Sequence, residues 1–158
     1  MTVVRRASGG DCAEIARLLK LIAAQHGAGR PDLFDDSCAK YDAGGVAALL
    51  ADNAVFVAEG EDGGMSGYLI AKIKDQPNVA VRKAYRCLYV DDLCVDPDSR
   101  KQGAGQALFE AAKEFARENG CYNIELNVWE FNGGARAFYE RMGMSTQKRT
   151  MELLLNPD

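Results

Sequence analysis

The sequence predicts an α/β fold of the α+β type, with a mixed, mostly antiparallel central sheet and helices on both of its faces. Apolar residues recur with the helical period in four segments and with the alternating period of a strand in six others. These segments follow one another in the order β-α-α-β-β-β-α-β-α-β. Strands adjacent in the chain pair antiparallel, whereas strands joined through a helix pair parallel by a right-handed crossover, so the sheet is mixed.

The N-terminal part is expected to hold one strand and two helices. Residues 2–7 alternate as a short strand, and the first helix follows with Asp11 as its cap and Glu14 three residues later. Two glycines end this helix, and residues 43–52 form a second, shorter one. One face of the first helix is apolar at helical spacing: Ile15, Leu18, Leu19 and Ile22.

The rest of the chain combines a hairpin, further strands and two more helices. Strands at 54–60 and 65–75 make the hairpin across a tight EDGG connection, and a long strand at 84–96 ends at Pro97. The later elements are a helix at 103–120, a strand at 121–129, a helix from Asn132 to Gly143 and a final strand at 147–155.

The composition narrows the possible classes of function. With 158 residues, 47% of them apolar and 27% charged, the chain is expected to be a single globular domain over residues 1–158. The net charge is −4 and the 19 basic residues are spread out, which argues against nucleic-acid binding. No run of about 18 apolar residues exists, so no membrane span is expected. Five cysteines at wide spacings and one histidine argue against a metal site and favour free thiols in the cytoplasm.

The stretch VDPDSRKQGAGQALF, residues 95–109, carries the clearest functional signal. Its segment RKQGAG joins a strand to a helix, and its two glycines let backbone N–H groups approach an anion at the positive end of the helix. Arg100 and Lys101 add full charges. A P-loop is excluded because no Gly-Lys precedes Ser or Thr, and a dinucleotide fingerprint would need a third glycine where Leu108 stands. A solvated basic turn that merely opens a helix is the alternative.

This loop resembles the acetyl-CoA loop of the GNAT superfamily of N-acetyltransferases, whose pattern is Q/R-x-x-G-x-G/A. Arg100, Gly103 and Gly105 occupy the defined positions. The preceding LYVDDLCVDPDSR and the later LNVWEFNGGARAFYERMGM are similar to the family's flanking segments. The order of elements also matches along nearly the whole chain. The resemblance therefore implies the GNAT fold, in which two central strands splay apart.

The resemblance also implies acetyl-CoA as the cofactor and assigns residues to it. The splayed strands would be CLYVDDLCV and NIELNVW, and backbone groups near Leu93, Cys94 and Val95 would pair with the pantetheine arm as an added strand does. The remaining contacts fall on the pyrophosphate loop and the last helix: Arg100, Lys101, Gln102, Gly103, Ala104, Gly105, Gln106, Asn132, Phe138 and Tyr139.

The implied reaction moves an acyl group from a thioester to an amine, and it needs a base, donors for the oxyanion and an acid for the departing thiolate. Tyr139 is the candidate acid, because a phenol with a pKa near 10 can protonate a thiolate. Asn132 stands about two helical turns before it, so both are expected to face one ligand. A half-buried tyrosine bonded to the backbone is the alternative. The oxyanion donor is expected to be a backbone N–H near Leu93.

Asp91 and Asp92 are the candidates for the base. Adjacent residues of a strand point to opposite faces, so one of the two is expected to face the cleft, unless a β-bulge changes which one does. That carboxylate would take a proton directly, pass it through a water, or hold a cationic amine. An ion pair with an arginine on a neighbouring element is the alternative. An acyl-cysteine route through Cys94 is disfavoured because no histidine lies near it in sequence.

The acceptor is expected to bind at the loop between the first two helices and near the end of a splayed strand. The candidate contacts are Arg30, Phe34, Asp91 and Trp129. The function that the resemblance implies is acetyl transfer to a primary amine by direct attack in a ternary complex. The excess of acidic residues favours a small cationic amine over a protein or peptide amine. A CoA-binding sensor or interaction module without catalysis is the alternative, and both a monomer and a homodimer through the final strand stay open.

Overall fold

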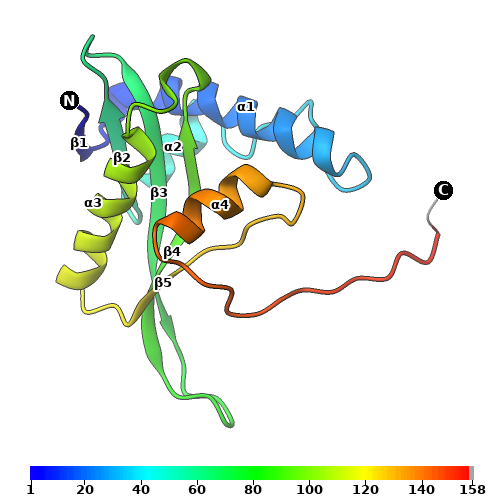
Figure 1. Cartoon of the computed structure of the whole chain (residues 1–158). Helices are drawn as coiled ribbons and strands as arrows, with labels where there is room; N and C mark the ends of the chain where they lie inside the picture. Colours follow the sequence, from blue (N-terminus) through cyan, green and yellow to red (C-terminus); the bar gives the residue numbers. More distant parts are fainter. Residues whose placement is uncertain (157–158) are drawn as a thin grey trace. The chain divides into compact units, whose positions relative to one another are not determined.

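The computed structural model describes residues 1–156 and divides into two compact units (Figure 1). The first unit runs from Met1 to Asn127 and contains the sheet with three α-helices. The second begins at Val128 and contains one α-helix. The assignment of residues 1–158 to one domain stays a prediction. None of the helices described within residues 1–156 is long and apolar enough to cross a membrane.

The sheet has five strands in the order β1-β2-β3-β4-β5. Neighbours among the first four pair antiparallel, whereas β5 pairs parallel with β4 because a helix connects the two. The mixed, mostly antiparallel sheet that the sequence predicts is therefore confirmed. The strands are β1 (Val3–Arg6), β2 (Ala54–Glu59), β3 (Met65–Gln76), β4 (Tyr85–Val95) and β5 (Asn123–Glu125).

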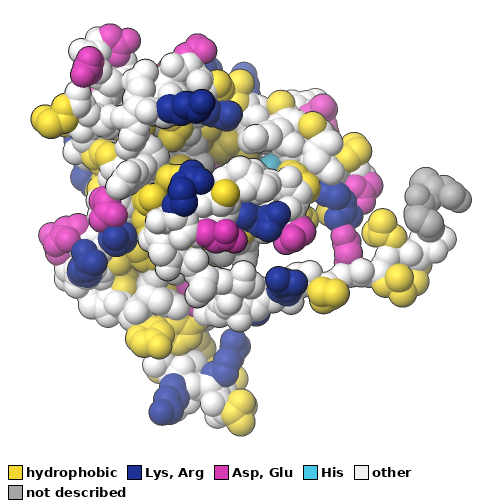
Figure 2. All heavy atoms as spheres, viewed as in Figure 1, with side chains coloured by type: hydrophobic (Ala, Val, Ile, Leu, Met, Phe, Trp, Pro, Cys, Tyr) yellow, Lys and Arg dark blue, Asp and Glu magenta, His cyan; other side chains and the backbone are white. Residues whose placement is uncertain are grey.

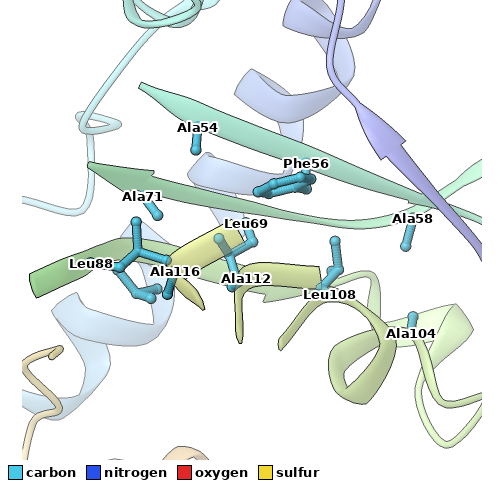
Figure 3. Packing of buried hydrophobic residues seen from close by; sticks show 11 residues of the cluster. Ala54, Phe56, Ala58, Leu69, Ala71, Leu88, Ala104, Leu108, Ala112 and Ala116 are labelled. Atoms are coloured by element: carbon cyan, nitrogen blue, oxygen red, sulfur yellow. The ribbon is translucent and has the colours of Figure 1, made fainter. Parts of the chain in front are cut away.

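Helices of the first unit cover both faces of this sheet, as predicted. α1 (Cys12–Gly29) and α2 (Ala43–Leu49) pack on one face. Of the predicted apolar stripe of α1, Ile15, Leu18 and Leu19 are buried there and Ile22 is partly buried. α3 (Ala104–Glu118) packs on the other face, where Leu108 meets the apolar side chains of the strands (Figure 3). Each fully buried leucine contributes about 2 kcal/mol through the hydrophobic effect.

Asp11 occupies the N-cap position of α1, as predicted, but its side chain does not act as the cap. Its carboxylate makes no capping hydrogen bond to that helix. It accepts instead from the Arg5 guanidinium at 2.9 and 3.0 Å and from the backbone N–H of Ser8 at 2.7 Å. The hydrogen bond from Arg5, opposed by burial, lowers the pKa of Asp11 to about 2. The pair ties β1 to the start of α1.

β3 and β4 extend past the rest of the sheet as a long hairpin (Figure 1). β2 pairs with β3 only as far as Ala71, so the residues beyond it have β4 as their one ladder partner. Val79 and Val81 at the tip are 52% and 98% exposed. Figure 2 shows hydrophobic and basic side chains close together on the part of the molecule that projects at the bottom of the view. Residues 77–84 connect the two strands and include an isolated bridge between Val79 and Arg82.

Two strands differ from the sequence-based expectation. Of the strand expected at 121–129, only Asn123–Glu125 form a strand, since β4 pairs with this segment only from Cys87 to Tyr89. The strand expected at 147–155 is wrong, since residues 144–156 contain neither helix nor strand. An alternating sequence becomes a strand only where a neighbour bonds its N–H and C=O groups.

Candidate active site

A β-bulge in β4 decides where the two adjacent acidic residues point. Ile70 of β3 pairs with Asp92, whereas the next residue, Ala71, pairs with Val90. Asp91 is therefore an extra residue in β4, with no partner of its own in the register. Such an insertion moves the alternation of side chains by one position for the rest of the strand.

The bulge places both aspartates on the same face of the sheet. Val90 before it and Leu93 after it both pack against the α3 cluster, a spacing that an unbroken strand does not allow. Asp91 and Asp92 thus face the side of α1 and α2, where both lie within 4 Å of Lys40. The prediction that the two point to opposite faces is wrong, and the physical reason is the bulge.

The Lys40 ammonium lies beside both carboxylates. Its Nζ is 2.8 Å from Oδ1 of Asp91 and 3.5 Å from Oδ2 of Asp92. The Tyr41 hydroxyl donates a hydrogen bond to Oδ2 of Asp91 at 3.3 Å. The ion pair weighed as an alternative is therefore present, with a lysine where an arginine was expected. One cation serves two acidic groups.

Asp92 has the more unusual environment of the two acids. Its side chain is 11% exposed, against 23% for Asp91. Its Oδ2 is buried and accepts no hydrogen bond from the residues that the structure describes. Burial, opposed by the positive charge of Lys40, raises the pKa of Asp92 to about 6. A carboxyl group that titrates near neutrality suits proton transfer.

Tyr68 of β3 lies on the same face and was not identified from the sequence. Its side chain is fully buried, and its hydroxyl has no hydrogen-bond partner among residues 1–156. Burial and the negative charge of Asp92 raise the pKa of Tyr68, so the hydroxyl stays protonated. An unpaired buried hydroxyl costs about 1–3 kcal/mol. The sequence could not have identified Tyr68, because the bulge in β4 determines which face of the sheet carries Asp91 and Asp92.

β4 has an open edge beside these carboxylates. Within residues 1–156, β5 pairs with β4 only through Tyr89, and from Val90 to Val95 the ladder continues with β3 alone. The pairing of β4 with β5 thus stops where the splay implied by the family resemblance is expected to begin. Backbone groups along this edge are positioned to pair with an extended ligand that carries amides, as an added strand would. Leu93, Cys94 and Val95 lie in this segment.

Cys94 is poorly suited to act as a nucleophile. Burial raises the pKa of its thiol to about 11, so the reactive thiolate is scarce at neutral pH. Within the described residues its sulfur contacts the carbonyl oxygens of Leu18 and Val95 at 4.0 and 3.8 Å. These observations agree with the prediction against an acyl-cysteine route.

The loop after β4 leads directly into the start of α3. Lys101 and Gly103 have positive φ angles of 69° and 82°, and Gly103 occupies the N-cap position. Gly103 has no side chain that could cap the first N–H groups of α3, which begins at Ala104. Uncapped N–H groups at a helix start attract an anion, and the basic residues of the loop add charge. The geometry expected for the segment at 100–105 is present.

Two of the predicted acceptor residues, Arg30 and Phe34, lie in the loop after α1. Each contacts a residue nearby in the sequence. Arg30 pairs with Asp32 at 2.7 Å, and the ring of Phe34 lies 4.9 Å from that of His26. Lys40 and Tyr41 are residues of this connection that reach the acidic pair, and sequence reasoning missed both. The ion pair of Lys40 with Asp91 spans 51 positions of the chain, so no local pattern reveals it.

The second unit holds the other predicted residues. Asn132 caps α4 (Gly133–Arg141), as predicted, with Oδ1 accepting from the N–H of Ala135 at 3.2 Å. Phe138 and Tyr139 meet edge to face at 5.3 Å, and Trp129 stacks against another aromatic ring at 5.9 Å. The roles of these residues toward a cofactor or acceptor stay predictions.

Comparisons with known proteins identify the family. The model of the acetyltransferase (GNAT) family matches residues 15–144. Thialysine N-epsilon-acetyltransferase of Bos taurus is 26% identical over 147 residues, covering 89% of this chain and 82% of that protein. Streptothricin acetyltransferase of Streptomyces lavendulae is 34% identical over 95 residues, which are 60% of this chain and 46% of that protein.

A solved structure agrees with this assignment. A mutant of the BH1408 protein from Bacillus halodurans is 31% identical and superposes with a TM-score of 0.92, covering 97% of this chain and 99% of that one. Fold, motif and family model point the same way. The chain belongs to the acetyltransferase (GNAT) family, a family of acyltransferases.

Proposed function

We propose that this protein transfers an acetyl group from acetyl-CoA to a primary amine by direct attack in a ternary complex. One arrangement carries the proposal: a mostly buried carboxylate pair lies on β4 beside a strand edge that β5 leaves unpaired, and this strand leads into a helix whose N-cap is a glycine. The relatives named for acetyl transfer to thialysine and streptothricin support an acetyl-transfer function.

The residues of the first unit fit acetyl-CoA, which supplies an activated acetyl thioester when bound. The open edge at Leu93, Cys94 and Val95 offers N–H and C=O groups to the amides of a pantetheine arm. The start of α3 offers N–H groups to a pyrophosphate. The proposed loop contacts are Arg100, Lys101, Gln102, Gly103, Ala104, Gly105 and Gln106.

Asp92 is proposed as the base and Asp91 as the group that holds the acceptor ammonium. A free alkylammonium has a pKa of about 10.4, so it must lose a proton before its nitrogen can attack. Asp92, with a pKa of about 6, accepts that proton directly or through a water. A backbone N–H near Leu93 donates to the carbonyl oxygen as it gains negative charge.

Tyr139 is proposed to donate a proton to the leaving sulfur as the C–S bond breaks and the new C–N bond forms. Asn132 and Phe138 are proposed to line the cofactor on the same side. Oδ1 of Asn132 is engaged in capping α4, so its amide nitrogen is the group that remains for a ligand. These roles rest on the family resemblance together with the position of all three on α4 or at its cap.

A small cationic amine is the favoured acceptor, and a protein or peptide amine is the alternative. Two carboxylates on one face of β4 attract positive charge, which supports the cationic class. Arg30, Phe34 and Trp129 are proposed as further acceptor contacts.

Cofactor binding is tested by thermal unfolding with and without acetyl-CoA. Ligand at 100 times its Kd stabilises the folded state by about 2.7 kcal/mol, which corresponds to an increase of about 5–10 °C in Tm for a chain of this size. Gly103→Glu places a carboxylate at the proposed pyrophosphate site and is expected to abolish the increase. Gly120→Glu is the matched control, because Gly120 also has a positive φ and an open surrounding at the other end of α3.

The absence of any increase in Tm for the unmutated protein would contradict the cofactor assignment, as would equal losses in both variants. Release of thiol from acetyl-CoA across polyamines, amino acids, aminoglycosides and peptides then separates enzyme from sensor. Release with any of these amines supports catalysis. Cofactor binding without release by any of them supports the non-catalytic CoA-binding alternative.

A homodimer and a cytoplasmic location are also proposed. Met151, Leu153 and Leu155 are 84–85% exposed, and apolar side chains this exposed favour association with a partner surface. A monomer at every concentration tested by light scattering would contradict the dimer. All five cysteines are free thiols in the structure, which supports a reducing compartment.

A further inference from the structure

The acidic face of β4 already holds a cation from the same chain. Lys40 comes from the connection between α1 and α2, and its side chain is 48% exposed. The carboxylates that it contacts are mostly buried, with 23% and 11% of their side chains exposed for Asp91 and Asp92. The lysine therefore reaches them from the solvent side. An acceptor that approaches the carboxylates from solvent meets the Lys40 ammonium.

The contact of Lys40 is weak enough to be exchanged. An ion pair with one half-exposed partner favours the paired arrangement by about fivefold over the unpaired one, because water screens it and a long side chain loses freedom. Only the bond to Asp91 is short, at 2.8 Å, while the distance to Asp92 is 3.5 Å without the geometry of a hydrogen bond. The carboxylates are mostly buried, so a cation beside them is favourable whichever ammonium group supplies it.

We propose that Lys40 is the resident counter-ion of the acceptor site and that the ammonium group of the acceptor displaces it from Asp91 and Asp92. The inference rests on the proposed function above. An acceptor that brings its own positive charge replaces the one it removes, whereas a neutral acceptor leaves Asp91 and Asp92 without a cation. Lys40 thereby selects for cationic acceptors. It acts as a specificity-determining residue, with no part in the bond changes themselves.

The neighbouring groups fit an exchange of one ammonium for another. The Tyr41 ring lies 5.7 Å from Nζ of Lys40, within reach of a cation–π contact. Its hydroxyl donates to Asp91 and keeps that carboxylate oriented while the cation changes. Among the described residues, the titratable or charged groups that interact with the pair include Lys40, Tyr41, Tyr68 and Cys94, while His26 interacts with Lys40.

The first test measures binding without turnover. The probe is n-butylamine, whose ammonium and alkyl chain copy the Lys40 side chain, added without acetyl-CoA at about pH 8, where ordinary carboxyl groups are ionised. Calorimetry should give a Kd about fivefold lower for Lys40→Met and Lys40→Gln than for the unmutated protein, because the internal competitor is gone. Lys40→Arg keeps the positive charge and should bind with the original affinity.

Lys113→Met provides a matched control. Lys113 pairs with Glu110 at 2.9 Å, as Lys40 pairs with Asp91, but its partner is 51% exposed and lies on α3. Its replacement should leave the affinity for n-butylamine unchanged. Equal or weaker binding by both neutral Lys40 variants would overturn the proposal and assign Lys40 a structural role. Melting curves confirm that each variant is folded, and Lys40→Gln replaces Lys40→Met if the latter is not.

The second test uses turnover of the same amine. The neutral variants should show a KM for the acceptor about fivefold lower, with kcat within twofold of the original. If Lys40 had only a structural role, replacing it would not lower the KM for the acceptor while leaving kcat unchanged. If no amine is acetylated, the proposed function fails, while the binding experiment still decides the counter-ion role. If the amine is acetylated but the neutral Lys40 variants leave both the Kd for n-butylamine and the KM for the acceptor unchanged, the counter-ion role alone fails.

Discussion

Replacing Asp92 by Asn is expected to stabilise the protein at neutral pH while it removes the proposed base. The usual pKa of this carboxyl is 3.8, and burial raises it to about 6 in the folded chain. Each pKa unit corresponds to about 1.36 kcal/mol, so ionised Asp92 costs the folded state about 3 kcal/mol. The side chain is only 11% exposed, so solvent screening reduces this figure little.

The sign of the pH dependence follows from the raised pKa. The folded state binds the proton more tightly than the unfolded one, so the favourable contribution is complete below pH 3.8 and is lost as pH rises through about 6. Asn resembles the protonated carboxyl. Asp92→Asn should therefore gain up to about 3 kcal/mol at about pH 8, and the gain should shrink towards zero by about pH 4.

Urea unfolding of the two proteins across this pH range measures the difference directly. A variant that is less stable at about pH 8, or a gain that does not change with pH, would refute the argument that burial of the charge sets the pKa. In kinetic assays the unmutated protein should lose activity as pH falls through about 6. Asp92→Asn should lower kcat/KM by about 100- to 10,000-fold while acetyl-CoA still raises Tm.

Three further predictions test the framework and the proposed acid. Asp11→Asn should destabilise the fold by about 2 kcal/mol at neutral pH, because the pKa of Asp11 is lowered to about 2, and urea titrations should show the loss shrinking as pH falls through that value. Gly67→Ala should cost about 2 kcal/mol or more, because a Cβ there would lie 2.7 Å from the Cys94 carbonyl oxygen, whereas Gly44→Ala in α2 should be neutral or stabilising by thermal unfolding. Tyr139→Phe should slow thiol release about 100-fold or more with an unchanged acetyl-CoA Kd, and equal rates would remove Tyr139 from the mechanism.

Much of the fold follows from local pattern. The helical stripe of Ile15, Leu18 and Leu19 is buried as its spacing predicts, because an amphipathic helix has one face to hide. The glycines that end α3 and α4 adopt positive φ angles of 67° and 93°. The prediction of a strand at 147–155 was wrong because a strand, unlike a helix, needs hydrogen bonds from a neighbouring strand, which its own residues do not specify.

The candidate site also has some features that follow from consecutive residues and others that only the tertiary structure determines. The glycine-containing loop at 100–105 and its helix are local features, so their chemistry could be predicted from consecutive residues. The acidic pair was also recognisable, but its direction was not. One extra residue in β4 turns Asp91 and Asp92 to the same face, and register is a property of two paired strands. Lys40 completes that face from 51 positions away, where only the packing of α1 and α2 on the sheet brings it.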